Sequence, residues 1–162
     1  MKIETLTAAD WEAVREIYQA GLDTKIATFE TEVPDAATLD KKFLPYCRLI
    51  VRGDDGIWGW AALTPTSPRY VYRGVNEVSI YISPAARGQG VGKVLLQALV
   101  DCSEAHDVWT LQATIQASNA PSIKLHAGCG FRIVGTRERI AMRDGIWQDT
   151  VLMERRSKIA GV

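Results

Sequence analysis

Cysteine and histidine are scarce in this chain of 162 residues, which has three cysteines and two histidines. The cysteines, Cys47, Cys102 and Cys129, are odd in number, far apart and without a Cys-x-x-Cys pair. Disulfide frameworks and zinc knuckles are built from more numerous and more closely spaced thiols, so we expect neither. His106 and His126 do not have the spacing of a His-Glu-x-x-His zinc site. We therefore predict no metal centre.

An excess of charge and a long apolar run are also absent. The chain has 19 basic and 19 acidic residues, so its formal net charge is zero. This balance argues against a nucleic-acid or membrane partner, because both are bound through a concentrated basic face. The first residues lack the apolar core of a signal peptide, and no run approaches transmembrane length. We expect a cytoplasmic protein in a reducing compartment.

The chain reads as a single domain, residues 1–162, because no repeat, linker or low-complexity stretch divides it. Alternating or β-rich stretches predict strands at residues 2–6, 47–52, 57–63, 77–83, 109–116, 131–139 and 147–154. Helical periodicity predicts helices at residues 8–21, 35–45, 91–102 and 119–128, with an irregular segment at 23–33. This order indicates an α/β (α+β) domain in which a mixed sheet carries helices on both faces.

A glycine-rich turn, Arg87-Gly88-Gln89-Gly90-Val91-Gly92-Lys93, connects the strand at 77–83 to the strongly amphipathic helix that follows. Glycines allow left-handed turns and close approach of a ligand, and amides at a helix N-terminus converge on an anion such as a phosphate. The turn departs from the P-loop pattern because Lys93 is followed by Val94, and from GxGxxG because position 93 is not glycine. A turn that only connects the two elements is the alternative.

Two motifs in order carry a resemblance to a known family. The glycine turn resembles the [QR]-x-x-G-x-[GA] signature of the GCN5-related N-acetyltransferases (GNAT), and the stretch from Asn119 to Phe131 resembles their second signature. The resemblance covers nearly the whole chain. It implies a GNAT-type, mostly antiparallel central sheet, acetyl-CoA (coenzyme A) as the cofactor and a homodimer. It implies cofactor contacts from Ile80, Tyr81, Ile82, Arg87, Gly88, Gln89, Gly90, Val91, Gly92, Lys93, Asn119 and Ser122.

Four further stretches, residues 28–32, 72–73, 77–82 and 144–149, narrow the resemblance. Together they resemble the phosphinothricin and methionine sulfoximine acetyltransferase subfamily. This implies an enzyme that transfers acetyl to the α-amine of a small amino acid or analogue, such as phosphinothricin, methionine sulfoximine or methionine sulfone.

Glu77 is the candidate general base. Acetyl transfer requires an uncharged amine, and a carboxylate on the strand that leads to the glycine turn is well placed to accept its proton. Period-two alternation places Glu77, Ser79 and Tyr81 on one face and Val78, Ile80 and Ile82 on the other. The resemblance assigns the base role to this position, whereas a lone glutamate at a strand start is ordinarily solvated.

His126 is the candidate general acid for the departing thiolate, because most of the superfamily has a tyrosine there and the phosphinothricin-type branch has histidine. Asn119, Ser122 and His126 share one helix face. The alternative is a packed histidine whose ring nitrogen is satisfied, and coenzyme A thiolate can also leave unaided.

The acceptor side is less defined in the sequence. Arg73 and Arg69 precede Glu77 and are candidates to bind a substrate carboxylate through a bidentate guanidinium. Phe29 and Glu30 are candidates to shape the amine pocket, together with Glu77, Val78 and Ser79. Cys129 reads as a buried small thiol, so direct transfer in a ternary complex is favoured over a covalent cysteine route.

Two other functions remain open at this point. One is acetylation of an arylamine, a polyamine or a peptide N-terminus by the same fold. The other is an acyl-CoA-binding module without turnover.

Overall fold

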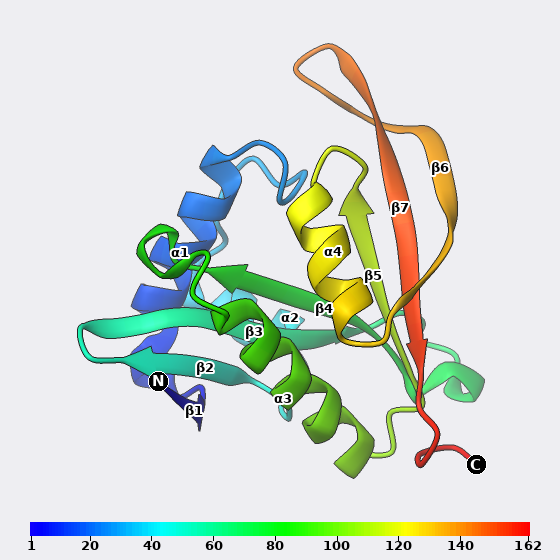
Figure 1. Ribbon diagram of the computed structural model, residues 1–162, viewed down its shortest axis with the longest axis horizontal. Helices are drawn as coiled ribbons and strands as arrows, with labels where there is room; N and C mark the ends of the chain where they lie inside the picture. The colour runs from blue at the N-terminus through cyan, green and yellow to red at the C-terminus, as the bar shows by residue number, and fades with distance from the viewer.

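The computed structural model describes residues 1–162 and contains one seven-stranded sheet with helices on both faces. The strands are β1 (Lys2–Thr5), β2 (Leu49–Gly53), β3 (Gly56–Pro65), β4 (Val75–Ile82), β5 (Thr110–Gln116), β6 (Arg132–Arg143) and β7 (Ile146–Arg156). The helices are α1 (Trp11–Asp23), α2 (Ala36–Lys42), α3 (Val91–Ala105) and α4 (Ala120–Gly128). Short 3-10 turns are η1 (Ala8–Asp10), η2 (Tyr70–Tyr72) and η3 (Pro84–Ala86). The predicted element order and mixed sheet are confirmed (Figure 1).

The sheet opens in its middle, between β4 and β5. The strand order is β1-β2-β3-β4-β5-β7-β6, and only β4 and β5 are parallel. They pair over three positions, the last being Glu77 opposite Gln112, although both strands continue. On its other edge β4 pairs with β3 along its length, from Asn76 to Ile82. The strands therefore part after Glu77, and this gap positions the site described below.

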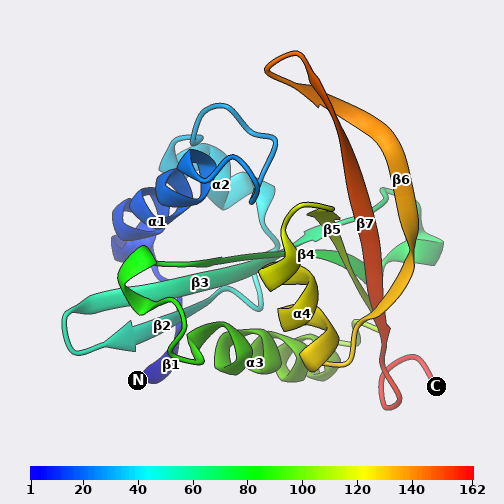
Figure 2. The same ribbon diagram turned by 45° about the horizontal axis from the view of Figure 1, so that its top comes forward.

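Helices lie on opposite sides of the sheet (Figure 2), and each side contains its own cluster of buried apolar residues. The helix α3 packs on one side through Leu95, Leu96, Leu99 and Val100, which are fully buried with the inner residues of β2, β3 and β5. The helix α1 packs on the other side through Trp11, Val14, Ile17 and Tyr18, together with Leu39 of α2. Each helix buries the apolar stripe that its 3.6-residue period predicts.

The clearest departures from the predicted bounds are at α2 and in the β6–β7 hairpin. The helix α2 ends at Lys42 because Phe43 is extended and buried, and the Leu44 amide bonds to the Leu63 carbonyl of β3 at 2.9 Å. The β6–β7 hairpin is longer than predicted and projects beyond the sheet (Figure 1). Its turn uses Asp144 and Gly145, both with positive φ, which matches the twist of a hairpin.

The expectation about the cysteines is wrong for one pair. Cys47 and Cys102 form a disulfide, with Cα atoms 5.7 Å apart, although 55 positions separate them. Cys47 lies in the loop before β2 and Cys102 lies near the end of α3, and the packing of α3 on the sheet brings these distant segments together. Cys129 is a free, buried thiol, as expected. No helix of the protein has both the length and the apolar character needed to cross a membrane.

Candidate active site

Two adjoining cavities lie along β4. The first, the Glu77 pocket, has a volume of about 390 Å³, and the second, the glycine-loop groove, has a volume of about 460 Å³. Both are lined by Ala27, Ile80, Tyr81, Asn119 and Ser122, so they meet between the middle of β4 and the start of α4. Of the predicted residues, the pocket is also lined by Phe29, Glu30, Glu77, Val78, Ser79 and His126. The groove is also lined by Ile82, Arg87, Gly88, Gly90, Val91 and Gly92.

The glycine turn forms the wall of the groove with backbone atoms. Gly88 and Gly90 have φ values of +76° and +79°, and a Cβ at either position would meet no atom within 4 Å. Gly90 is the N-cap residue of α3 and offers no side chain to the first amides of that helix. Those amides have no partner within the helix, and together with its dipole they favour an anion. Arg87 is exposed beside them and forms no ion pair with a carboxylate, so its charge is free to meet the same anion.

Two residues of the turn do not line either cavity. The Gln89 side chain donates to the Ala85 carbonyl at 2.8 Å, which closes the loop onto the preceding η3 turn. Lys93 is exposed on the first turn of α3. The other residues of the turn, from Arg87 to Gly92, therefore line the groove, and these two do not.

The backbone of β4 offers hydrogen-bonding groups to the gap. The Ser83 amide donates to the Trp58 carbonyl of β3 at 2.8 Å, and β4 and β3 pair without a register shift. In an antiparallel ladder, alternate residues bond to the partner strand, so the amide of Tyr81 also faces β3. The amides of Ile80 and Ile82 then face the gap left by β5. They are the donors available to an acyl oxygen held there.

Glu77 lies where β4 and β5 part. Its carboxylate is half-buried and accepts a hydrogen bond from Gln112 of β5 at 3.1 Å. On the other side of β4, Glu77 pairs with Thr64 of β3. The strand pairs on both sides fix the backbone of Glu77, while one oxygen is oriented by an amide donor. This arrangement suits a carboxylate that accepts a proton inside the pocket.

His126 is 2 % exposed on α4 and lines the Glu77 pocket. Its Nδ1 lies 2.8 Å from the Ser122 carbonyl, which only accepts hydrogen bonds, so Nδ1 carries the proton. Its Nε2 is buried and has no partner. Burial lowers the pKa of His126, and the Ser122 carbonyl opposes that shift. The neutral imidazole therefore has a lone pair on Nε2 that no group of the protein meets.

The floor of the pocket contains two phenols that sequence reasoning did not assign to it. Tyr18 of α1 and Tyr81 of β4 contact each other with ring centroids 4.7 Å apart. Burial raises the pKa of Tyr18, and burial and the neighbouring Tyr18 raise that of Tyr81. Both hydroxyls therefore stay protonated and able to donate. For Tyr18, helical periodicity in the sequence indicated packing alone, whereas the resemblance implied a cofactor contact for Tyr81.

The irregular segment 24–33, which carries Phe29 and Glu30, is held by side chains from distant elements. Gln116 of β5 and Arg143 of β6 both donate to the Thr28 carbonyl, at 3.0 Å and 2.6 Å. Asn119 donates to the Ile26 carbonyl at 3.3 Å while its Oδ1 caps α4. These contacts explain how a segment without helix or strand forms a defined pocket wall.

The arginines expected to bind a carboxylate lie outside both cavities. Arg73 stacks on Tyr70 and Trp109, with its guanidinium 4.4 Å and 5.1 Å from the ring centroids. Arg69 lies over Tyr72. The cation that does line the Glu77 pocket is Lys42, at the end of α2. Sequence reasoning missed Lys42 because only the docking of α2 brings it to the pocket.

Comparisons with known proteins agree with this geometry. A family model described as the acetyltransferase (GNAT) family matches residues 11–131. A phosphinothricin N-acetyltransferase from Alcaligenes faecalis is 38 % identical over 155 residues, covering 90 % of this chain and 77 % of that protein. An L-methionine sulfoximine/L-methionine sulfone acetyltransferase from Pseudomonas aeruginosa is 30 % identical over 152 residues, covering 90 % and 88 %.

A solved structure provides the corresponding match in three dimensions. The crystal structure of a phosphinothricin acetyltransferase from Sinorhizobium meliloti in complex with acetyl-CoA superimposes with a TM-score of 0.90 and 31 % identity. The match covers 99 % of this chain and 90 % of that chain. The chain belongs to the GNAT family and is an N-acetyltransferase that uses acetyl-CoA.

Proposed function

We propose that the enzyme acetylates the α-amine of a small amino acid or amino-acid analogue, of the phosphinothricin, methionine sulfoximine or methionine sulfone type. The observation that carries this proposal is the lining of the Glu77 pocket. It combines two carboxylates, Glu30 and Glu77, with one cation, Lys42, and it opens onto the glycine-loop groove. The names of the relatives from Alcaligenes faecalis and Pseudomonas aeruginosa support the same acceptor class.

The charges of the pocket complement those of an amino acid. An α-ammonium is attracted to Glu30 and Glu77, and the α-carboxylate of the acceptor, or the side-chain phosphinate of phosphinothricin, is attracted to Lys42. The volume of about 390 Å³ is in the range of small-molecule pockets. A polyamine carries several cations and no anion, so Lys42 disfavours it.

Glu77 is proposed as the base that makes the amine nucleophilic. It accepts a proton from the ammonium, directly or through a water, and the amine then attacks the thioester carbonyl. The amides of Ile80 and Ile82 stabilise the negative charge that develops on the acyl oxygen. The groove formed by Arg87 and the turn from Gly88 to Gly92 holds the pyrophosphate of the donor.

His126 is proposed to act as an acceptor of a hydrogen bond and to orient the pocket, because its proton resides on Nδ1 and faces Ser122. An acid role would need a second proton on Nε2, and burial disfavours the charged ring. Transfer is direct, since no cysteine lines either cavity. The coenzyme A thiolate then leaves. It is protonated by solvent or by the proton that the amine released.

The test is detection of free thiol from acetyl-CoA with a panel of acceptors. It contains phosphinothricin, methionine sulfoximine, methionine sulfone, an arylamine, spermidine and a short peptide. We expect turnover with the first three. Turnover with only spermidine, the arylamine or the peptide would replace the proposed acceptor class. Coenzyme A binding without turnover on any acceptor would contradict the proposal and favour a binding module.

We further propose that the enzyme is a homodimer and acts in the cytoplasm. The apolar segment of β7 is not the contact, because Val151 and Met153 belong to the core. Six of the exposed large apolar residues lie on the long hairpin instead, and they are Ile133, Val134, Ile140, Met142, Ile146 and Trp147. Since β6 is an edge strand, its free backbone groups can pair with a second copy. Light scattering should give twice the chain mass of 17.9 kDa, and Ile140→Glu should give a monomer.

A further inference from the structure

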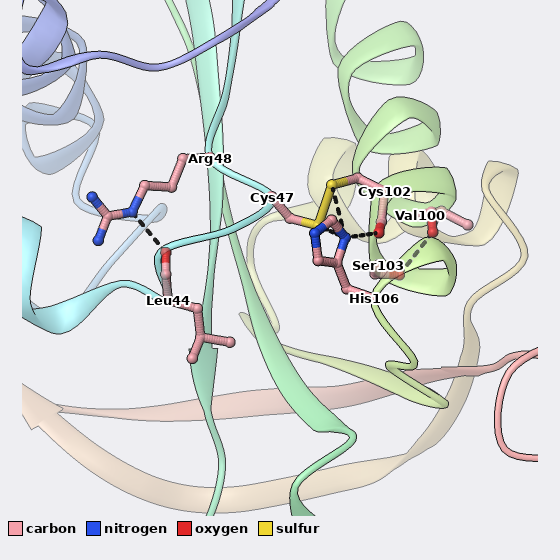
Figure 3. Close-up of a disulfide and its surroundings, with 7 residues drawn as sticks. All are labelled: Leu44, Cys47, Arg48, Val100, Cys102, Ser103 and His106. Carbon is pink, nitrogen blue, oxygen red and sulfur yellow. Dashed lines mark hydrogen bonds between the residues drawn. A yellow bond between two sulfur atoms is a disulfide. The ribbon is translucent and has the colours of Figure 1, made fainter.

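A cluster of two cysteines and a histidine, here called the thiol site, lies outside both cavities. It consists of Cys47 from the loop between α2 and β2, Cys102 from the last turns of α3, and His106, which follows that helix (Figure 3). We propose that the thiol site is a reversible redox modification site. In it, Cys47 and Cys102 exchange between dithiol and disulfide, and His106 stabilises the attacking thiolate. This inference does not depend on the acceptor proposed above.

His106 is oriented toward both sulfur atoms. Its Nδ1 lies 3.7 Å from Sγ of Cys47 and 3.8 Å from Sγ of Cys102, and 2.9 Å from the Cys102 carbonyl oxygen. That carbonyl only accepts, so Nδ1 is the protonated nitrogen, and its N–H is within reach of the sulfurs. Tyr46 stacks on the ring at 4.7 Å with planes 5° apart and fixes its orientation. A fixed N–H donor beside a sulfur favours the thiolate, which is the reactive form.

The two sulfurs differ in access, which sets the order of the reaction. Cys102 is partly exposed, whereas Cys47 is only 4 % exposed. The Cys102 thiolate attacks a sulfur of a small disulfide such as oxidised glutathione, forms a mixed disulfide and releases one glutathione thiolate. The Cys47 thiol then gives its proton to the released glutathione thiolate and attacks the Cys102 sulfur, which releases the second glutathione as a thiolate that is protonated by water. Two protein thiols are oxidised and one small disulfide is reduced to two thiols.

A metal centre fits the same residues less well. The three candidate ligand atoms do lie within 4.8 Å of one another. However, the Nδ1 that faces the sulfurs carries a proton bonded to the Cys102 carbonyl, so it has no free lone pair for a metal. The site also offers only three donors, and a closed structural zinc site needs four.

Closure of this bond joins two functionally distinct parts of the fold. The loop that contains Cys47 follows α2, which carries Lys42, and α3 begins at the glycine turn. The loop keeps its conformation by other contacts, because Arg48 donates to the Leu44 and Phe43 carbonyls at 2.6 Å and 2.7 Å. The reduced protein should therefore fold and turn over normally. The oxidised protein should resist unfolding, because the bond closes a loop of 55 positions in the unfolded chain.

The experiment equilibrates the full-length protein in glutathione buffers of graded ratio, followed by acid quench, alkylation and peptide mass spectrometry. We expect Cys47 and Cys102 to lose alkylation together and Cys129, which is buried, to stay a thiol throughout. Oxidation should raise the melting temperature by about 5 °C or more, and Cys102→Ser should remove this rise. A pair that stays open in every buffer, or closed in every buffer, contradicts the proposal. So does binding of Zn²⁺ to the reduced protein that protects both thiols from exchange.

His106→Phe tests the histidine separately. Phenylalanine keeps a ring to stack on Tyr46 but has no N–H. We expect exchange with oxidised glutathione to slow about tenfold near neutral pH, while the gain in melting temperature on oxidation is unchanged. Cys129→Ser is the control and should react at the wild-type rate. An unaltered exchange rate in His106→Phe would remove the histidine from the mechanism.

Discussion

The glycine-loop groove and the Glu77 pocket adjoin each other but are built in different ways. About half of the residues that line the groove come from one continuous stretch, the end of β4, the glycine turn and the start of α3. The others come from α1, the segment that follows it and the start of α4. The pocket is formed by side chains from α1, α2, β4, β5, α4 and the irregular segment 24–33. A local stretch can specify an anion site through amides and φ angles, whereas a pocket of side chains exists only after the elements have docked. The groove therefore suits a donor shared by a family, and the pocket suits an acceptor that varies.

Among substitutions that alter only the pocket or only the groove, Glu77→Gln in the pocket should have the largest effect on activity. It keeps the size of the side chain and its contact with Gln112 but cannot accept the amine proton. We expect kcat/KM for the amino-acid acceptor to fall about a hundredfold or more, because a positioned base contributes that much. The Kd of acetyl-CoA, measured by calorimetry, should change less than about twofold. An equal loss of kcat/KM and of acetyl-CoA affinity would mean that Glu77 maintains the separation of β4 and β5 instead of acting as the base.

Lys42→Gln separates the charge of the pocket from its shape. We expect KM for an acceptor with a carboxylate to rise about tenfold, because a charge-assisted contact is lost. The matched control is Arg73→Gln, which removes an exposed cation stacked on Tyr70 and Trp109 outside the pocket and should leave KM within about twofold. The reverse result, in which Arg73→Gln raises KM and Lys42→Gln does not, would return the carboxylate contact to Arg73.

The groove is tested by its backbone conformation, with Gly90→Ala. An alanine at φ +79° is strained by about 1–2 kcal/mol, and relief of this strain moves the amides at the start of α3. We expect the Kd of acetyl-CoA to rise about fivefold. Gly145→Ala is the matched control, since Gly145 has φ +76° and open space around its Cβ but lies in the β6–β7 turn. It should lose similar stability and keep its affinity, and a parallel loss of affinity would indicate a global effect.

The same contrast explains what the sequence could predict. The glycine turn, Glu77 and the faces of β4 were predictable, because each depends on local spacing and period. Lys42, Tyr18 and the clamp on Thr28 from Gln116 and Arg143 were not, because each side chain reaches its place through the packing of a distant element. The Cys47–Cys102 pair was missed for the same reason, since 55 positions of sequence spacing do not define a distance in space. The position of Arg73, the candidate for binding a carboxylate, could not be predicted either, because the fold turns its side chain toward Tyr70 and Trp109.

The smallest expected effect is on the free energy of unfolding near neutral pH. It comes from protonation of His126, the buried histidine of the pocket. Burial lowers the pKa of His126 in the folded protein, so the unfolded chain takes up a proton first as pH falls. The stability that depends on neutral His126 is thus fully present above the unfolded pKa and is lost as pH falls toward the folded pKa. Near pH 7 this linkage is worth at most about 0.2 kcal/mol, and at lower pH it cannot exceed about 1.4 kcal/mol per pH unit.

His126→Gln makes this contribution measurable by urea unfolding at a series of pH values. The difference in unfolding free energy between wild type and variant should shrink as pH falls from about 8 to about 5.5, because only the wild type has this proton to gain. The groove is lined by no histidine or carboxylate, and burial raises the pKa of Tyr81 further above this range, so the Kd of acetyl-CoA should stay nearly constant over it. A stability difference that is independent of pH would mean that the folded protein tolerates a charged His126. The Nε2 atom would then be able to donate a proton, and the acid role for the departing thiolate would be restored.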